Sequence, residues 1–466
     1  MNDNKALKSG AWYTLSNFFV KSIGFMMTPI FARLLTKEEF GLYNNFVSWL
    51  GIFTIVITLY LESTFASARF DFKEDFEGYI LSSLVLSSVV CAFSAIFLNV
   101  FYFIFQKSLG MNRLYMNVML LYLLFLPAIN MFQAHERYKY EYKKTVLLSL
   151  MISISSACLS LALVLLMTNR LSARVYGSLI PVIVIGSYIY YIIYRNGKRI
   201  HISYWKYSLK ICLPYIPHLL SLNVLNSVDR IMITRIRGAE ENAVYSLAYT
   251  CGTIITTLVI SVNSAFSPWL GEKLNAKEYS NIKKISTKYL LLFWGVAVLI
   301  MLLTPEVLMI LGGKKYLNAV QILPPIACGC IFQFLYTMCV NIEQFEKKTI
   351  GMAFASISAA LLNYILNSIF IPLYGNVAAA YTTLAGFAWL LLVHMFLVFK
   401  YGFHKVYSYT CFSIVILCSI ILMVFIDYLY DHNILRYIIL SIYVISLLIM
   451  ILKNKHKVLV LFKNNQ

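Results

Sequence analysis

The chain has 466 residues, of which 60% are hydrophobic and only 13% are charged. A soluble domain carries about 25% charged residues, so this composition excludes an ordinary soluble protein and predicts a surface that faces lipid. The formal net charge of +19 would suggest a nucleic-acid partner in a soluble protein. Here the basic residues stand in short segments between apolar runs, which is typical of membrane orientation by positive loops, and we expect no nucleic-acid partner.

The apolar runs predict an all-α integral membrane protein, since a spanning helix needs about 20 mostly apolar residues. The first run, which follows Lys5 and Lys8, is too long for the core of a signal peptide, so we expect it to be retained. Fourteen spans are expected in chain order, at 11–35, 41–61, 78–105, 115–134, 145–167, 175–193, 209–233, 243–266, 289–311, 317–340, 350–371, 377–399, 406–426 and 435–452.

Lys and Arg residues are distributed unevenly between the two sets of connecting segments. The set that includes both termini carries more than twice as many of them as the other set. Cytoplasmic segments are enriched in Lys and Arg, so we expect both termini to be cytoplasmic. The basic tail after residue 452 is expected to lie against anionic membrane lipids.

The nine cysteines all lie inside apolar runs, where they act as small hydrophobic residues. Cys328-x-Cys330 has no His or Cys at ligand spacing nearby, so we expect no metal site and no disulfide framework.

An internal repeat is visible when the sequence is shifted by 202 residues. Matched pairs include polar positions, namely Tyr13 with Tyr215, Arg33 with Arg235, Glu38-Glu39 with Glu240-Glu241, and Tyr43 with Tyr245. The repeat predicts two like-oriented six-helix lobes, at 1–200 and 201–405, with the last two helices and the tail at 406–466. Transporters commonly place their substrate site between such halves.

Two segments resemble a known family. Residues 28–43, TPIFARLLTKEEFGLY, and in the second half residues 227–233 with 240–249 are similar to the polysaccharide transporter family, the O-antigen and capsule flippases called Wzx. The resemblance covers roughly residues 5 to 400. The family shares a superfamily with multidrug and toxin extruders (MATE) and with lipid II flippases.

The resemblance implies two lobes around a central cavity and alternating access. A membrane enzyme usually needs a sizeable outer loop or an embedded His/Asp cluster; the outward loops here are short and the sequence has no such cluster, so we expect no enzymatic activity. The resemblance also implies a cargo of undecaprenyl-pyrophosphate-linked oligosaccharide, moved across the bacterial cytoplasmic membrane for surface polysaccharide synthesis. A polysaccharide polymerase and a chain-length regulator are the implied protein partners. No cofactor is implied beyond an H+ or Na+ gradient. The alternative is a MATE-type cation-coupled drug antiporter, which would need acidic rather than basic cavity residues.

Charged residues inside apolar helices cost roughly 2.5–3.5 kcal/mol each on insertion scales, so they usually face a cavity or a partner. Lys21 lies in the middle of the first helix, where Asn17, Lys21, Gly24 and Thr28 share one helical face. We interpret this stripe as a cavity lining in which Lys21 meets an anionic headgroup. An interhelical ion pair or hydrogen bond is the other interpretation.

The seventh helix carries a second polar set, Asn223, Asn226, Asp229 and Arg230. Adjacent helical residues point about 100° apart, so Asp229 and Arg230 cannot face the same spot. Arg230 is the candidate for the cargo phosphate, with Asn223 and Asn226 as cavity candidates. Asp229 is the candidate for holding Arg230 or for binding a coupling cation, and a purely structural role for the pair is equally open.

Three further residues are candidates for coupling or gating. His218 titrates near neutral pH and is a candidate proton relay, although a hydrogen-bonded structural histidine is the commoner case. Glu62 and Arg69, which follow the second helix, are candidates for an inner gate or for an ordinary salt bridge.

Overall fold

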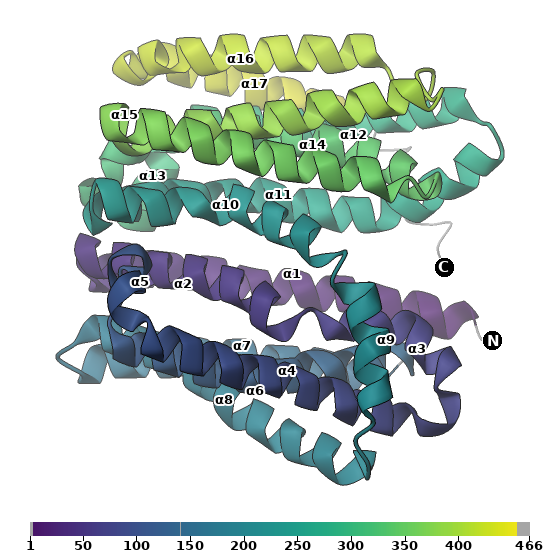
Figure 1. The fold of residues 1–466 in the computed structure, drawn as a ribbon. Coiled ribbons are helices and arrows are strands. Elements are labelled where there is room, and N and C mark those ends of the chain that lie inside the picture. The colour runs from purple at the N-terminus through teal and green to yellow at the C-terminus, as the bar shows by residue number, and fades with distance from the viewer. Residues whose placement is uncertain (1–2, 140, 454–466) are drawn as a thin grey trace.

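The computed structural model describes residues 3–139 and 141–453 and is built from helices (Figure 1). The α-helices are α1 (Asp3–Leu34), α2 (Lys37–Thr58), α3 (Phe65–Asp71), α4 (Phe76–Val100), α5 (Tyr102–Leu109), α6 (Arg113–Tyr138), α7 (Tyr142–Leu166), α8 (Arg170–Gly197), α9 (Ile202–Cys212), α10 (Ile216–Ile236), α11 (Ala239–Asn275), α12 (Tyr279–Leu302), α13 (Thr304–Gly312), α14 (Leu323–Phe345), α15 (Thr349–Lys400), α16 (Tyr409–Asp431) and α17 (Asn433–Lys453). Short 3-10 turns lie at Leu61–Thr64, Lys73–Asp75 and Lys314–Gln321.

The helices form two stacked groups (Figure 1). Helices α1 to α8 make up one group and α10 to α17 the other, while α9 crosses between them at the end of the bundle where α1 begins. We call that end the near side and the opposite end the far side. The axes of α9 and α10 differ by 54°, so the chain turns sharply as it enters the second group.

The count of spans differs from the prediction of fourteen. Within residues 3–139 and 141–453, ten helices are long and apolar enough to cross a membrane, or eleven if the bent pair of α9 and α10 is one span. Helices α1 and α17 are not among these ten, although they are 32 and 21 residues long, which is enough to cross a membrane by length.

Helix α15 covers two of the predicted spans, because it is a hairpin that counts as one element. Gly375 breaks it with φ +67° and ψ −147°, a backbone region essentially restricted to glycine. Bonds between the two arms show that they run antiparallel: Trp389 Nε1 donates to Ser358 Oγ (3.0 Å), and Asn363 Nδ2 donates to Thr383 Oγ1 (3.4 Å).

Helix α2 begins where the sequence provides a capping box. The Thr36 hydroxyl accepts a hydrogen bond from the Glu39 amide (3.1 Å), and the Glu39 carboxylate accepts one from the Thr36 amide (2.9 Å). Two of the free amides at the helix start are thereby satisfied. The box fixes the sharp return of the chain from α1 into α2 on the far side.

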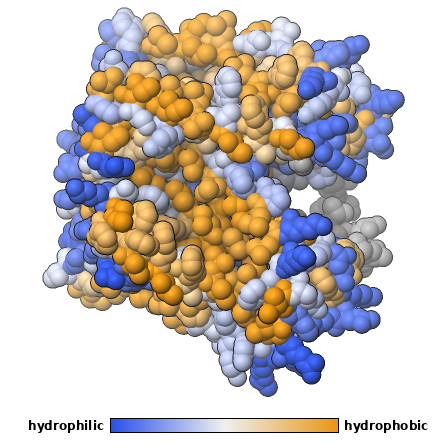
Figure 2. Space-filling view, in the orientation of Figure 1, coloured by the Kyte–Doolittle hydropathy of each residue, from blue (hydrophilic) through white to orange (hydrophobic). Residues whose placement is uncertain are grey.

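The two groups are joined on the far side. Asn242 of α11 donates to the carbonyl of Gly41 on α2 (2.8 Å), and a Cβ atom on Gly41 would lie only 1.8 Å from the carbonyl oxygen of Ala239. Arg33 donates to Ile310 O and Lys315 donates to Leu35 O, both at 2.8 Å. On the near side, Figure 2 shows a notch between the groups.

Candidate functional site

A cavity of about 700 Å³ lies between α1 and α11, where the two helix groups face each other. It is lined on the α1 side by Phe18, Lys21, Ser22, Gly24, Phe25, Met26 and Thr28, and on the α11 side by Thr250, Thr253, Ile254, Thr256, Thr257 and Leu258. Its walls therefore combine one cation, several hydroxyls and apolar side chains, which suits an amphipathic ligand.

Lys21 is the charged residue of this cavity. Its side chain is exposed, and within the described part of the chain it makes no hydrogen bond or ion pair. The interhelical ion pair, which was the other interpretation of the sequence, is not formed in this structure. Asn17, one turn earlier on α1, is also exposed but does not line the cavity.

Arg230 lies outside this cavity. Its guanidinium carbon is 4.3 Å from the centre of the Tyr249 ring, and its Nη1 donates to the carbonyl of Asn226 (3.3 Å). The Tyr249 hydroxyl in turn donates to Asn226 Oδ1 (2.9 Å). Arg230, Asn226 and Tyr249 thus form one cluster between α10 and α11, in which the arginine stacks on an aromatic face.

Asn223 lies where α10 meets α2, close enough to Gly51 that a Cβ atom there would be 3.2 Å from its Nδ2. Its Oδ1 is buried and has no hydrogen-bond partner among the described residues. Asn223 and Lys21 therefore belong to different parts of the boundary between the helix groups.

Asp229 is fully enclosed in the second group. Its carboxylate accepts hydrogen bonds from the Tyr245 hydroxyl (2.5 Å), from Asn367 Nδ2 (2.6 Å) and from the Thr383 hydroxyl. Asn367 Nδ2 also donates to Asn363 Oδ1 (3.2 Å). The network joins α10, α11 and both arms of α15, and Asp229 points away from Arg230 as the helical spacing predicted.

The sequence did not identify Asn367, Tyr245 and Thr383 as partners of Asp229, or Asn363 as the next member of the network. Asn363 and Asn367 are one turn apart on a helix, and this spacing was the only signal. Such spacing does not distinguish a ligand contact from a contact with a neighbouring helix. The structure shows both amides in interhelical hydrogen bonds.

His218 is hydrogen-bonded within the second group. Its Nδ1 lies 2.8 Å from Ser356 Oγ on α15, and its ring centre lies 5.7 Å from that of Tyr215. The structure thus places His218 in the surroundings of an ordinary hydrogen-bonded histidine.

Glu62 and Arg69 do not pair with each other. Glu62 Oε1 accepts from Asn130 Nδ2 (3.1 Å), while the guanidinium of Arg69 stacks over the rings of Phe70 and Tyr138, at 4.4 Å from each. The salt bridge considered from the sequence is therefore absent from the described residues.

Glu62 borders a separate near-side pocket of about 360 Å³, lined by Tyr60, Glu62, Ser63, Asn130, Gln133, Ala134, Arg137 and Tyr138. Its second carboxylate oxygen is buried and accepts no hydrogen bond from the residues that the structure describes. Burial raises the pKa of Glu62 to about 7, because the charged form loses hydration that one amide does not replace.

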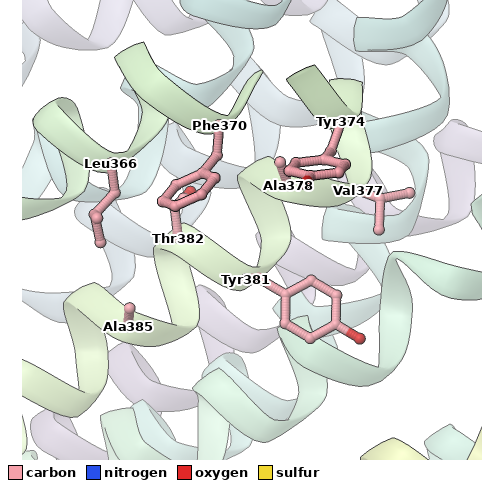
Figure 3. Close-up of a pocket in the computed structure, with 8 residues that line it drawn as sticks. All are labelled: Leu366, Phe370, Tyr374, Val377, Ala378, Tyr381, Thr382 and Ala385. Carbon is pink, nitrogen blue, oxygen red and sulfur yellow. The ribbon is translucent and has the colours of Figure 1, made fainter. Parts of the chain in front are cut away.

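A groove of about 420 Å³ lies between the two arms of α15 near the hairpin tip (Figure 3). Phe370, Tyr374 and Tyr381 stand around it, and Thr382 lies between the arms. The Thr382 hydroxyl is already engaged with Asn367 Oδ1. The groove offers an almost entirely apolar surface and is not suited to a charged headgroup.

The fold is that of a known class of membrane transporters. The chain is similar to the lipid II flippase MurJ in its inward closed conformation, with a TM-score of 0.69 at 16% identity over 96% of this chain and 99% of that one. It is also similar to an inward-facing multidrug resistance MATE transporter of the MOP superfamily, with a TM-score of 0.63 at 14% identity over 88% and 95% of the two chains.

A family model described as "Polysaccharide biosynthesis protein" matches residues 6–274, and a MatE model matches residues 214–369. The chain therefore belongs to the polysaccharide biosynthesis protein family, a family of multi-pass membrane transporters and not of enzymes. Uncharacterised membrane proteins of Haemophilus influenzae and Methanocaldococcus jannaschii are each 22% identical to it, over 76% and 82% of this chain and 88% and 82% of theirs.

Proposed function

We propose that this transporter is a flippase that moves a lipid-linked oligosaccharide, with an undecaprenyl pyrophosphate carrier, across the bacterial cytoplasmic membrane. The observation that carries the proposal is Lys21 in the cavity between the helix groups, which has no ion-pair partner among residues 3–139 and 141–453. An ammonium group at membrane depth is costly unless a ligand or water offsets its charge, and a pyrophosphate headgroup is such a ligand.

The positions of the two junctions support an alternating-access cycle. The groups touch on the far side through Asn242, Arg33 and Lys315 and are notched on the near side. With the near side cytoplasmic, as the basic segments predict, the structure is the inward-facing state. The headgroup would enter between α1 and α11 while its prenyl tail stays in the lipid, and the groups would then rock to open the far side.

We assign the coupling role to Asp229. Its buried carboxylate accepts hydrogen bonds from the Thr383 hydroxyl and from Asn367 Nδ2, and Asn363 Oδ1 accepts from the same amide nitrogen. A buried carboxylate can take up a proton, whereas a hard cation, which prefers oxygen ligands, would need these donors to turn away. Because the network connects α10 to both arms of α15, its occupancy would alter how these helices pack. Arg230, next to it, stays a candidate for the cargo phosphate in a later state of the cycle.

The cargo role of Lys21 is tested by Lys21→Gln in cells that lack the wild-type gene, with surface polysaccharide as the measurement. We expect output to fall at least about tenfold, since a lost charge-assisted hydrogen bond is worth about 1.5–3 kcal/mol, and to be restored in part by Lys21→Arg. Lys284→Gln, which removes an exposed near-side cation, is the control and should leave output unchanged. Full output from Lys21→Gln would remove this residue from the mechanism.

The coupling role of Asp229 is tested by thermal unfolding of the purified protein in Na+ or K+ buffers and across pH 5–8. We expect stabilisation either by Na+ or by acid in the wild type, because a ligand that binds only the folded state stabilises it, and neither effect in Asp229→Asn. The exposed Asp427 provides the control Asp427→Asn. A wild-type protein that responds to neither ion contradicts the assignment.

The drug antiporter is the alternative, since the MatE model matches part of the chain and the fold is shared. Deletion of the gene would then raise drug sensitivity and leave surface polysaccharide unchanged.

A further inference from the structure

The two walls of the α1–α11 cavity differ in the hydrogen bonds that they leave available. On the α11 wall, Thr250, Thr253 and Thr257 present a row of hydroxyls spaced by three and four residues, so they share one helical face. Each of the three is half-buried. Their remaining hydrogen-bonding capacity decides which part of a ligand can dock against them.

All three hydroxyl protons are already used inside the helix. Thr250 donates to Ser246 O (2.8 Å), Thr253 to Thr250 O (2.6 Å) and Thr257 to Thr253 O (2.7 Å). A carbonyl oxygen can only accept, so each hydroxyl must be the donor and is left with lone pairs alone. Thr256, beside them, donates in the same way to Thr253 O (3.1 Å). The α11 wall is therefore a surface of hydrogen-bond acceptors.

The α1 wall has the opposite character. Lys21 brings three N–H donors and no acceptor, and Ser22 has a hydroxyl that makes no hydrogen bond within the described residues. Thr28, which donates to Gly24 O (3.1 Å), is the exception at the far end of this wall. Donors thus stand on α1 and acceptors on α11, across a single cavity.

We infer that α11 is the sugar-recognition wall of the cargo site. This inference rests on the proposed function. The phosphate oxygens of the headgroup carry no donors and bind the Lys21 side. The sugar hydroxyls next to the phosphate are donors and bind the lone pairs of Thr250, Thr253 and Thr257. The wall accepts hydrogen bonds from hydroxyl groups in general, so any hydroxylated sugar attached to the pyrophosphate can bind it. A lipid phosphate without a sugar makes no hydrogen bonds to this wall.

The test uses two probes on the full-length protein in detergent: undecaprenyl pyrophosphate, and the same lipid carrying N-acetylglucosamine. Their affinities are compared by native mass spectrometry. We expect the wild type to bind the glycosylated lipid more tightly, and Thr253→Val with Thr257→Val to lose that preference, roughly fivefold for each hydroxyl contact of about 1 kcal/mol. The valine variants should keep the wild-type affinity for the sugar-free lipid.

Thr253→Ser with Thr257→Ser is the matched control, because it retains both hydroxyls and should retain the preference. Lys21→Gln should weaken the binding of both probes by the same factor. Valine variants that keep the preference, or a wild type that binds both lipids equally, would overturn the inference while leaving the flippase proposal intact. Failure of the wild type to bind either lipid would instead reject the flippase proposal. Thermal unfolding of each variant separates loss of binding from loss of folding.

Discussion

At the scale of single residues, the intramembrane charges of this transporter have different environments. Lys21 is exposed to a cavity, whereas Asp229 is 1% exposed and surrounded by donors. The sequence identified both residues, because a charge inside an apolar run is conspicuous. It could not predict their surroundings, since Asn367 and Thr383 lie 138 and 154 residues away from Asp229 along the chain. Helical spacing relates residues only within one helix.

Glu62 gives a prediction about pH. Its pKa is raised by burial from an ordinary value of 4.5 to about 7, so the folded state keeps it protonated over a range in which the unfolded state ionises. Stability is therefore complete below about pH 4.5 and falls as the pH rises toward 7. We expect Glu62→Gln to be more stable than the wild type at pH 8, by on the order of 1–3 kcal/mol, and equal to it near pH 4.5.

The measurement is thermal unfolding in detergent at both pH values. Glu74→Gln, which changes an exposed carboxylate on the same near-side segment, should show no such difference. A stability gap between Glu62→Gln and the wild type that is the same at both pH values would show that the carboxyl proton is not responsible.

At the scale of helices, apolar length predicted most of the elements and not all of their breaks. The residues of a capping box, Thr36 and Glu39, are present in the sequence, yet the predicted span begins only at residue 41, whereas α2 begins at Lys37. By contrast, nothing local shows that α9 crosses the bundle and meets α10 at 54°. Its side chains bind the first group instead: Tyr207 donates to Asp71 (2.6 Å) and Trp205 to the carbonyl of Ser82 (2.8 Å).

The hairpin of α15 depends on Gly375. Its backbone lies in a region that a residue with a Cβ atom avoids, and a Cβ atom there would be 2.7 Å from Glu241 Oε2. We expect Gly375→Ala to destabilise the protein by roughly 1–3 kcal/mol, measured as a lower midpoint of thermal unfolding. Gly271→Ala, where the nearest atom would be 3.9 Å away, should change the midpoint little. Equal midpoints for the two variants would show that the turn tolerates a side chain.

At the scale of the whole molecule, the internal repeat has a counterpart in the helix boundaries. Helices α1 and α10 end at Leu34 and Ile236, and α2 and α11 begin at Lys37 and Ala239, so that both pairs are 202 residues apart. The repeat predicted that these helices correspond. It could not predict that α2 and α11 touch at the far side, because a repeat states equivalence and says nothing about contact.

Gly41 controls how closely the two groups approach. A methyl group at this position would overlap the backbone of Ala239, which cannot rotate away as a side chain can. We expect Gly41→Ala to raise the ratio of molecules that are open on the far side to molecules that are closed there. The ratio rises more than tenfold if the overlap costs more than about 1.4 kcal/mol.

The distance between spin labels at Lys107 and Lys314, one on each group at the far side, measures this shift once the exposed Cys158 and Cys418 have been replaced by Ser. Longer distances are expected for Gly41→Ala than for the wild type. Gly271→Ala is again the control, and a distance distribution identical to the wild type in Gly41→Ala would rule out Gly41 as a determinant of closure.

The hydrogen bonds of the far-side junction limit how strongly the empty carrier prefers its present conformation. Among the described residues, the direct hydrogen bonds between residues 3–58 and the second group are those of Asn242, Arg33 and Lys315. Each is worth about 0.5–1.5 kcal/mol once exchange with water is counted, which sets the resting bias at a few kcal/mol. A single ligand with a comparable difference in affinity can reverse such a bias, so the empty carrier would be poised for reversal without hydrolysis of a nucleotide.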